Sequence, residues 1–258
     1  EQGIGNGISI LIFAGIVGRL PVVFFQTTTT VNQENIVNVG IFLVLGLIVV
    51  SSIVLISEAT RKIPVQYARR IRGTKMYGGQ STYLPLRLNQ AGVIPIIFAV
   101  SLVLLPSIFA NYLVVSGKNV LVQIGNFLQT AFNPEGLVYN LIYFLLVVGF
   151  TYFYTAVIFN PSKIAGEIQK YGGFIPGIRP GNPTASFLNY ILTRITFAGA
   201  IFLGLIAILP TLARQVTDIQ NLLLGGTGIL IVVTVVLELV KNLEAQLVMR
   251  SYEGFIKS

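Results

Sequence analysis

The residue types that carry most enzyme chemistry are missing from this sequence. Its 258 residues include no cysteine and no histidine, so thiolate nucleophiles, imidazole bases and the usual ligand sets for zinc, haem and iron–sulfur clusters are absent. The apolar runs also lack the paired aspartates or the Ser–His dyad that an intramembrane enzyme would need. We therefore expect that the chain is not an enzyme and holds no cofactor and no metal.

Basic side chains are the distinctive residues that remain, and they give a formal net charge of +8. One basic cluster consists of Arg69, Arg70, Arg72 and Lys75, with Tyr77 beside them. Such a cluster could meet nucleic acid or anionic lipid, although most clusters of this kind only enforce membrane topology. Arg179 lies among turn-forming Pro and Gly residues, which would hold it on a fixed protruding loop. A rigid arginine suits bidentate recognition of a carboxylate or a phosphate.

Glu238 lies just beyond an apolar run and could belong to an ion pathway. A charge near the membrane centre costs about 2.5–3.5 kcal/mol, so buried charges are often functional. Lys241 and Glu244 follow shortly after it. This spacing favours an interfacial ion pair over a transport site.

The elements that must position these residues are predicted to be membrane-spanning helices. Hydrophobic residues make up 54% of the chain and charged residues only 10%, whereas soluble domains carry about 25% charged residues. Most of the surface must therefore face lipid. A helix needs about 20 mostly apolar residues to cross a bilayer core of roughly 30 Å. Six charge-free runs approach this length: Gln2–Gly18, Asn35–Ser57, Leu88–Gly117, Gly136–Ser162, Ile195–Ala213 and Ile219–Leu237.

The lysines and arginines divide unevenly among the connections between these runs. They gather in the loop Glu58–Arg87, in the loop that follows Asn160 and in the C-terminal tail. Only Arg19, Lys118 and Arg214 lie elsewhere. Because cytoplasmic loops are enriched in Lys and Arg, this division predicts that both chain ends and the two long basic loops are cytoplasmic.

The predicted organisation follows from these runs. Residues 1–57 hold two transmembrane helices and an external loop, 58–89 a basic cytoplasmic loop, 90–159 two further helices, 160–185 a second cytoplasmic loop, 186–242 the last two helices, and 243–258 a cytoplasmic tail. The chain opens at Glu1 rather than methionine, so we interpret it as a fragment or a processed piece of a longer protein.

Turn residues predict where the two longest runs stop being helical. Asn111, Ser116 and Asn160-Pro161 should make these helices shorter than their runs. Gly92, Pro95 and Pro106 interrupt the third run, and proline removes a backbone donor and clashes with the preceding turn. This pattern predicts a kinked or mobile helix, although kinks in membrane helices are often only structural.

Six segments carry a distinctive series of residues: QSTYLPLRLNQAGVIP at 80–95, GIGNGISI at 3–10, FAGIV at 13–17, FNP at 159–161, FIPGIRPG at 174–181 and GGT at 225–227. Taken in their order along the chain, they resemble the bacterial SecY family, the pore subunits of the general protein-secretion channel. The resemblance covers nearly the whole chain and corresponds to the C-terminal half of the family, from its fifth to its tenth transmembrane helix.

The resemblance implies an all-α polytopic membrane protein that forms half of a ten-helix channel with inverted repeats. That channel translocates unfolded polypeptides across the bacterial cytoplasmic membrane and opens sideways to insert transmembrane segments. The N-terminal half of the family, with its plug helix and the other side of the lateral gate, has no counterpart in these 258 residues. This chain alone is therefore not expected to enclose a pore.

The resemblance also implies a pore constriction. Matching positions give Ile8, Ile12, Ile97 and Ile231. A ring of apolar β-branched side chains makes a narrow water column unfavourable and so blocks ions, yet it can part for a polypeptide. Without the resemblance, each isoleucine would be an ordinary packing residue of a membrane helix.

A lateral gate is the third implication. In the family the seventh helix, here about Gln90–Asn111, lines this gate, and the matching positions are Asn89, Gln90, Pro95, Ile97 and Ser101. Signal sequences would partition past this helix according to the transfer free energy of their side chains.

The two basic loops resemble the family's docking surface for the motor ATPase SecA and for the ribosome. The residues concerned are Arg69, Arg70, Arg72, Lys75, Tyr77 and Arg179, the last matching an arginine on which motor-driven secretion depends in the family. The further expected partners are SecE, SecG, the N-terminal half of SecY, anionic lipids, signal sequences and unfolded secretory polypeptides.

A secondary transporter for small solutes is the alternative from another functional class, since it also uses inverted repeats and broken helices. It would need polar or ionisable groups near the membrane midplane, and the apolar runs contain almost none.

Overall fold

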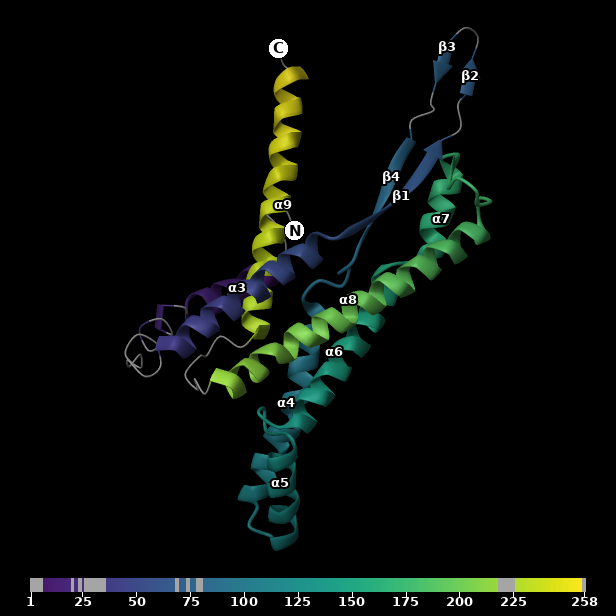
Figure 1. Ribbon diagram of the computed structural model, residues 1–258. Coiled ribbons are helices and arrows are strands. Elements are labelled where there is room, and N and C mark those ends of the chain that lie inside the picture. The colour runs from purple at the N-terminus through teal and green to yellow at the C-terminus, as the bar shows by residue number, and fades with distance from the viewer. Residues whose placement is uncertain are drawn as a thin grey trace. The chain divides into compact units, whose positions relative to one another are not determined.

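The protein is described from a computed structural model, in which residues 7–19, 21–22, 25, 36–67, 70–72, 75–77, 81–217 and 226–256 are placed. Figure 1 labels the helices and strands. The helices are α1 (Gly7–Val17), α3 (Ile36–Glu58), α4 (Ile94–Val115), α5 (Asn119–Ala131), α6 (Leu137–Ile158), α7 (Pro161–Lys170), α8 (Asn182–Thr217) and α9 (Gly226–Ile256). The strands are β1 (Thr60–Tyr67), β2 (Arg70–Arg72), β3 (Lys75–Tyr77), β4 (Ser81–Arg87) and β5 (Gly173–Phe174).

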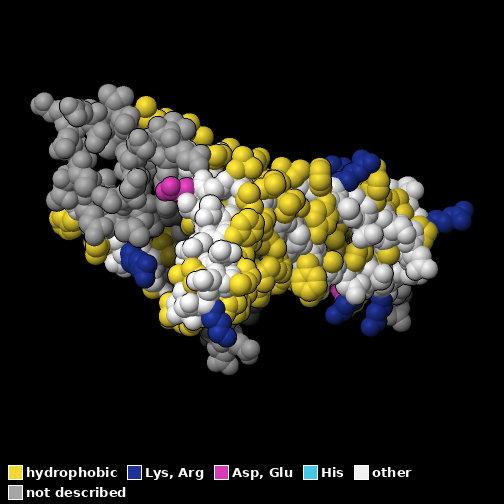
Figure 2. Space-filling view, turned by 90° about the horizontal axis from the view of Figure 1, so that it is seen from below, with side chains coloured by type: hydrophobic (Ala, Val, Ile, Leu, Met, Phe, Trp, Pro, Cys, Tyr) yellow, Lys and Arg dark blue, Asp and Glu magenta, His cyan; other side chains and the backbone are white. Residues whose placement is uncertain are grey.

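The predicted helical membrane protein is confirmed. Within the described residues, three helical stretches are long and apolar enough to cross a bilayer: Ile94–Val115, Leu137–Lys170 and Asn182–Leu209. Only 28% and 22% of the most apolar part of the first two is buried inside the protein, so the remaining apolar surface must face lipid or other membrane-embedded segments. Figure 2 shows such hydrophobic side chains over a broad part of the visible face. The other three expected spans coincide with α1, α3 and α9 and stay predictions.

The chain divides into two compact units. The first comprises Glu1–Leu55, Val100–Phe144 and Leu205–Ser258, and the second comprises Ile56–Ala99 and Leu145–Gly204. In the first unit, α1 packs along α9. The second unit contains all the strands that the structure describes and the described parts of the two long basic loops.

The first unit also contains a helical hairpin that the apolar runs did not predict. Helix α5 returns along α4, where Gly125 is buried close to Ala110 and Val114. The Gln129 amide donates a hydrogen bond of 2.8 Å to Oδ1 of Asn111. This bond satisfies Asn111 inside α4, so the helix continues past a residue at which a turn was expected.

Several helix ends differ from the apolar runs for local reasons. Helix α4 ends just before Ser116 and α6 just before Asn160, as the turn residues predicted. Gly92, with a φ of 66°, lies in the turn before α4, and Pro95 occupies the first turn of that helix, where a missing N–H costs nothing. Of the three residues expected to interrupt the helix, only Pro106 lies beyond its first turn, in the helix interior.

Helix α8 begins at Asn182, well before the apolar run that starts at Ile195. Its first turns are amphipathic and bury Leu188 and Ile191 in a hydrophobic core. Tertiary packing therefore extends the helix into the predicted second cytoplasmic loop. Helix α9 likewise continues to Ile256, through the predicted tail.

A close backbone contact fixes the start of the strand region against α8. A Cβ atom added at Gly199 would lie 2.6 Å from the carbonyl oxygen of Leu88, well inside van der Waals contact. The Leu88 N–H donates to the carbonyl of Ala59 over 2.9 Å, so this segment is also tied to the start of β1. Only glycine allows α8 to approach so closely.

Gly199→Ala should therefore destabilise the protein. The added methyl group must displace a backbone carbonyl, and overpacking of this kind costs about 1–3 kcal/mol. Thermal denaturation in detergent, followed as loss of the monodisperse species, should show a lower midpoint. Gly149→Ala in α6 is the matched control, because no atom of another element lies within 4 Å of its added Cβ. Equal midpoints for the two variants would contradict the contact.

Candidate functional site

Two loops that are far apart in the sequence form one structure. Strand β1 pairs antiparallel with β4 on one edge, and with β5 on the other through Gln66↔Phe174 and Tyr67↔Gly173. The sheet order is β4-β1-β5. We call the assembly of β1, β4, β5, α7 and the turn 175–181 the two-loop platform. Its parts come from the two predicted cytoplasmic loops, 58–89 and 160–185, and hydrogen bonding between them places both loops on the same side of the second unit.

The platform has an apolar inner face. Ile63 and Val65 of β1 and Leu86 of β4 are buried together with Ile175 and with Leu188 of α8. Because successive strand residues point to opposite faces, the residues between them face outward. The outward set is exposed and includes Lys62, Pro64, Gln66, Tyr83, Pro85 and Arg87. The core therefore makes the platform rigid, while its outer face exposes the cations Lys62 and Arg87 among prolines and other residues.

Arg179 is exposed on a turn that the core anchors at both ends. Ile175, which precedes the turn, is 3% exposed, and Thr184, which follows it, is 1% exposed. The hydroxyl of Thr184 donates a hydrogen bond of 2.9 Å to the carbonyl oxygen of Arg179. Gly177 and Gly181 have φ values of 82° and 97°, in the left-handed region that favours glycine. This turn presents the guanidinium from a fixed backbone, as the sequence predicted for a protruding loop.

Helix α7 closes the platform behind this turn. Its N-cap is Asn160, whose side chain accepts a hydrogen bond from the backbone N–H of Lys163 over 3.1 Å, and Pro161 occupies the first turn. Ile164 and Ile168 pack against the core. The charged residues Lys163, Glu167 and Lys170 are exposed. Helix α7 is the polar end of the stretch Leu137–Lys170, and its one apolar and one charged face are typical of a helix at a surface.

The predicted basic cluster lies mainly on a small hairpin beyond β1 and β4 (Figure 1). Strand β2 carries Arg70 and Arg72, and β3 carries Lys75 and Tyr77. The register pairs Arg70 with Tyr77 and Arg72 with Lys75, so the backbone brings these four residues together. Arg69 lies outside the described residues.

The predicted gate residues surround the start of α4. Asn89 and Gln90 precede the helix, Pro95 is buried in its first turn, and Ile97 and Ser101 follow at half-buried and exposed positions. The Asn89 amide donates a hydrogen bond of 3.3 Å to the carbonyl of Gly92. Its Oδ1 is buried without a hydrogen-bond partner. The bond bridges the turn that leads into α4 and so ties Asn89 to the entry of the helix.

The structure places the predicted constriction residues on three helices. Ile231 is 8% exposed on α9, and α1, which carries Ile8 and Ile12, packs along α9. The side chains of Ile8 and Ile12 lie outside the described part of the structure. Ile97 belongs to the second unit, whereas Ile231 belongs to the first. The convergence of these residues at one depth stays a prediction.

The sheet is the part of the candidate site that the sequence analysis missed. Its signal in the sequence was that the apolar residues Ile63, Val65 and Leu86 alternate with residues such as Lys62, Gln66 and Arg87, and the structure buries the first set and exposes the second. Pro64 and Pro85 weaken that signal, because proline is disfavoured inside strands. Pro64 is accommodated because it lies outside the stretch of β1 that pairs with β5. Among the described residues, no group of His, Cys, Asp or Glu is suited to hold a metal ion.

Comparison with known proteins agrees with this architecture. The family model SecY matches residues 1–240. The protein translocase subunit SecY of Mycobacterium bovis is 47% identical over 266 residues, which cover 100% of this chain and 59% of that protein. The subunit of Thermotoga maritima is 47% identical over 257 residues, covering 100% of this chain and 57% of that protein. The chain thus spans less than two thirds of the length of these relatives.

Two solved structures share the fold. One is a SecY channel in which the plug domain stabilises the closed state, with a TM-score of 0.55, 21% identity, and coverage of 94% of this chain and 60% of that chain. The other is a protein-conducting channel, also with a TM-score of 0.55, 20% identity, and coverage of 94% and 59%. With the match to the family model over most of its length, the chain belongs to the SecY family.

Proposed function

We propose that this chain is the C-terminal part of the pore-forming subunit of a protein-conducting channel, in which it supplies six transmembrane helices. The complete channel moves unfolded polypeptides across the bacterial cytoplasmic membrane and releases transmembrane segments sideways into lipid. The chain performs no catalysis in this scheme. The energy comes from the ATPase SecA or from the translating ribosome, and SecE, SecG and the N-terminal half of SecY complete the channel.

The observation that carries this proposal is the joining of two basic loops into one rigid platform. A motor that pushes a polypeptide needs a surface that does not yield under the reaction force. The β1–β5 pairing and the shared apolar core supply that rigidity. Exposed cations such as Lys62 and Arg179 supply recognition of acidic groups on a partner. A small-solute transporter has no need of such a platform.

The orientation of the chain follows from the same platform. The basic residues of β1, β2, β3 and α7 lie in the two loops that β1 and β5 join. Loops rich in Lys and Arg are retained in the cytoplasm, so the platform faces the cytoplasm, where SecA and ribosomes are found. Both ends of the chain lie on that same side when six helices cross the membrane.

The seventh helix of the family corresponds to α4 in this chain, and we propose that it lines the lateral gate. Its entry is the turn 88–93, in which Asn89 bonds to Gly92. Pro106 inside the helix removes one backbone hydrogen bond. The change of chain direction at this turn and the missing hydrogen bond at Pro106 favour a helix that can move as a segment against its neighbours when a signal sequence enters.

Arg179→Glu should abolish SecA-driven translocation while the membrane topology stays intact. The anchored turn holds the backbone in place, so the charge reversal changes recognition rather than folding. Translocation into inverted vesicles of the complete channel, measured by protease protection, should fall by at least an order of magnitude, as expected for about 1.4 kcal/mol or more of lost binding. Arg179→Lys keeps the charge but loses the bidentate fork, and should be intermediate.

Lys163→Glu is the matched control for this charge reversal. Lys163 is exposed on the same platform, in the first turn of α7, where a glutamate is favoured by the helix dipole. It should translocate as the unmodified channel does. Full activity of Arg179→Glu, or an equal loss in Lys163→Glu, would refute a specific role of Arg179.

Ile97→Asn and Ile231→Asn should each make the resting channel leak ions and relax its selectivity for signal sequences. A polar amide at the constriction stabilises water in a passage that apolar side chains keep dry. Ion conductance of the complete channel in planar bilayers measures this effect. Ile108→Asn, at a 50% exposed position on the same helix as Ile97, is the control and should not leak. Conductance that is unchanged in all three variants would remove Ile97 and Ile231 from the constriction.

A photocrosslinker at Ile97 or Ser101 should capture the signal sequence of a stalled translocation intermediate. Ile97 is half-buried and Ser101 exposed near the start of α4, where an apolar segment leaving the pore would pass. Crosslinked products are resolved by gel electrophoresis and mass spectrometry. The same crosslinker at Leu205, which is 49% exposed on α8, should give none. The gate assignment fails if no position along α4 crosslinks.

A further inference from the structure

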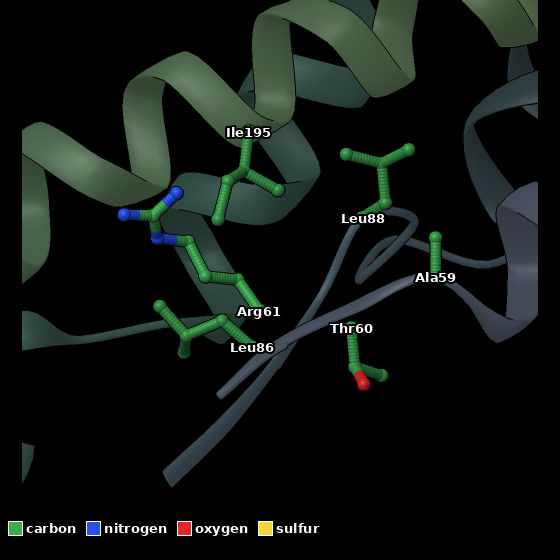
Figure 3. Close-up of a pocket in the computed structure, with 6 residues that line it drawn as sticks. All are labelled: Ala59, Thr60, Arg61, Leu86, Leu88 and Ile195. Atoms are coloured by element: carbon green, nitrogen blue, oxygen red, sulfur yellow. The ribbon is translucent and has the colours of Figure 1, made fainter. Parts of the chain in front are cut away.

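A cavity lies where the platform meets the start of the apolar region of α8. It has a volume of about 370 Å³, which is within the range of about 300–1,000 Å³ for small-molecule sites. All of its lining residues belong to the second unit: Ala59, Thr60, Arg61, Leu86, Leu88 and Ile195. Figure 3 shows Arg61 extending from β1 toward α8, beside Ile195, while the Thr60 side chain points the opposite way.

At this cavity, each of three segments has a boundary between a charge-free run and residues that carry charge. The apolar run of α3 ends a few residues before Arg61, a second run begins at Leu88 directly after Arg87, and a third begins at Ile195 directly after Arg194. Such a change in all three segments marks the boundary between water and hydrocarbon. The cavity therefore lies at the depth of the lipid headgroups.

Arg61 is the cation that the cavity offers. It is exposed, and it shares the inner side of β1 with Ile63, two residues further along the strand. The guanidinium of Arg194 instead lies 4.2 Å from the ring centroid of Tyr190. Arg87 is the register partner of Thr60, whose side chain points away from α8. The lining includes no acidic residue, and the nearest one in sequence is Glu58, at the end of α3.

The lining favours an amphiphile over a soluble anion. Four of the six residues are apolar, namely Ala59, Leu86, Leu88 and Ile195. Figure 3 shows Leu86 next to the base of the Arg61 side chain, Ile195 between Arg61 and Leu88, and Ala59 near Leu88. A free phosphate would gain nothing from these apolar side chains, whereas an acyl chain would bury apolar surface against them. An arginine fork matches the geometry of a phosphate diester.

We propose that this cavity binds one anionic phospholipid, with its headgroup phosphate on Arg61 and the upper part of an acyl chain against Leu86, Leu88 and Ile195. The lipid would lie beside the close contact that Gly199 makes with Leu88. It would thereby couple the lipid composition of the membrane to the position of the platform on α8. Such a site differs from the general attraction of basic loops to anionic membranes, because one particular cation, Arg61, and particular apolar side chains would contact the lipid.

The test uses the full-length protein in its complete channel complex, reconstituted in nanodiscs of phosphatidylcholine with a minor fraction of phosphatidylglycerol. The phosphatidylglycerol carries a photoreactive group high on one acyl chain, and labelled peptides are quantified by mass spectrometry. Peptides that contain Leu88 and Ile195 should be labelled. Arg61→Gln should reduce this labelling roughly fivefold, as expected for the loss of one basic side chain near an anionic headgroup, and Arg61→Lys should retain most of it.

Two controls separate the site from its surroundings. Lys62→Gln removes an exposed cation from the next, outward-facing position of the same strand and should leave the labelling unchanged. Ile195→Phe fills the cavity and should reduce labelling by photoreactive phosphatidylcholine as well as by phosphatidylglycerol. Each variant is first shown to elute from size-exclusion chromatography as the unmodified complex does.

The proposal is overturned if the unmodified complex shows no labelling at these peptides, if Arg61→Gln labels as the unmodified complex does, or if Lys62→Gln loses as much as Arg61→Gln. Suppression of the labelling by excess inorganic phosphate would indicate a site for soluble anions and would overturn the choice of a lipid. The readout requires no translocation, so either result leaves the proposed channel function to be decided by its own experiments.

Discussion

The absence of water in the bilayer core is the constraint on which the rest of the structure depends. Every backbone N–H and C=O group there must find a partner within the protein, so the chain crosses the bilayer as helices. Among the described residues, all strands lie in the segments 60–87 and 173–174, which also carry many of the basic side chains. The apolar helices thus lie in lipid, and the charged sheet lies in water.

The platform combines two properties that are usually found apart. Its inner face is a hydrophobic core of the kind that stabilises soluble domains, built around Ile63, Leu86 and Leu188. Its outer face presents cations, including Arg179 on an anchored turn. Because two loops share one core, neither can shift without disturbing the other. This property suits a surface that receives a force-generating partner.

The segment 88–93 connects the platform to the membrane region. It follows β4 directly, contacts α8 through the Leu88 carbonyl at Gly199, and leads into α4 through the bond between Asn89 and Gly92. Its contacts are short and mostly made by backbone atoms. A displacement of the platform would therefore also move the start of α4. The lipid that we place beside Leu88 would contact this same segment.

The sequence alone determined whether each segment lies in lipid or in water. Charge-free runs and clustered basic residues indicate lipid and water without reference to any contact, because the transfer free energy of a side chain depends on its own chemistry. For the same reason Ser116 and Asn160 mark helix ends correctly. The tertiary structure decided what forms outside the membrane. The pairing of Gln66 with Phe174 joins residues from separate loops, and no local pattern records such a partner. The start of α8 at Asn182 and the passage of α4 through Asn111 likewise depend on packing against distant residues, which can outweigh local preference once a core or a hydrogen bond satisfies the chain.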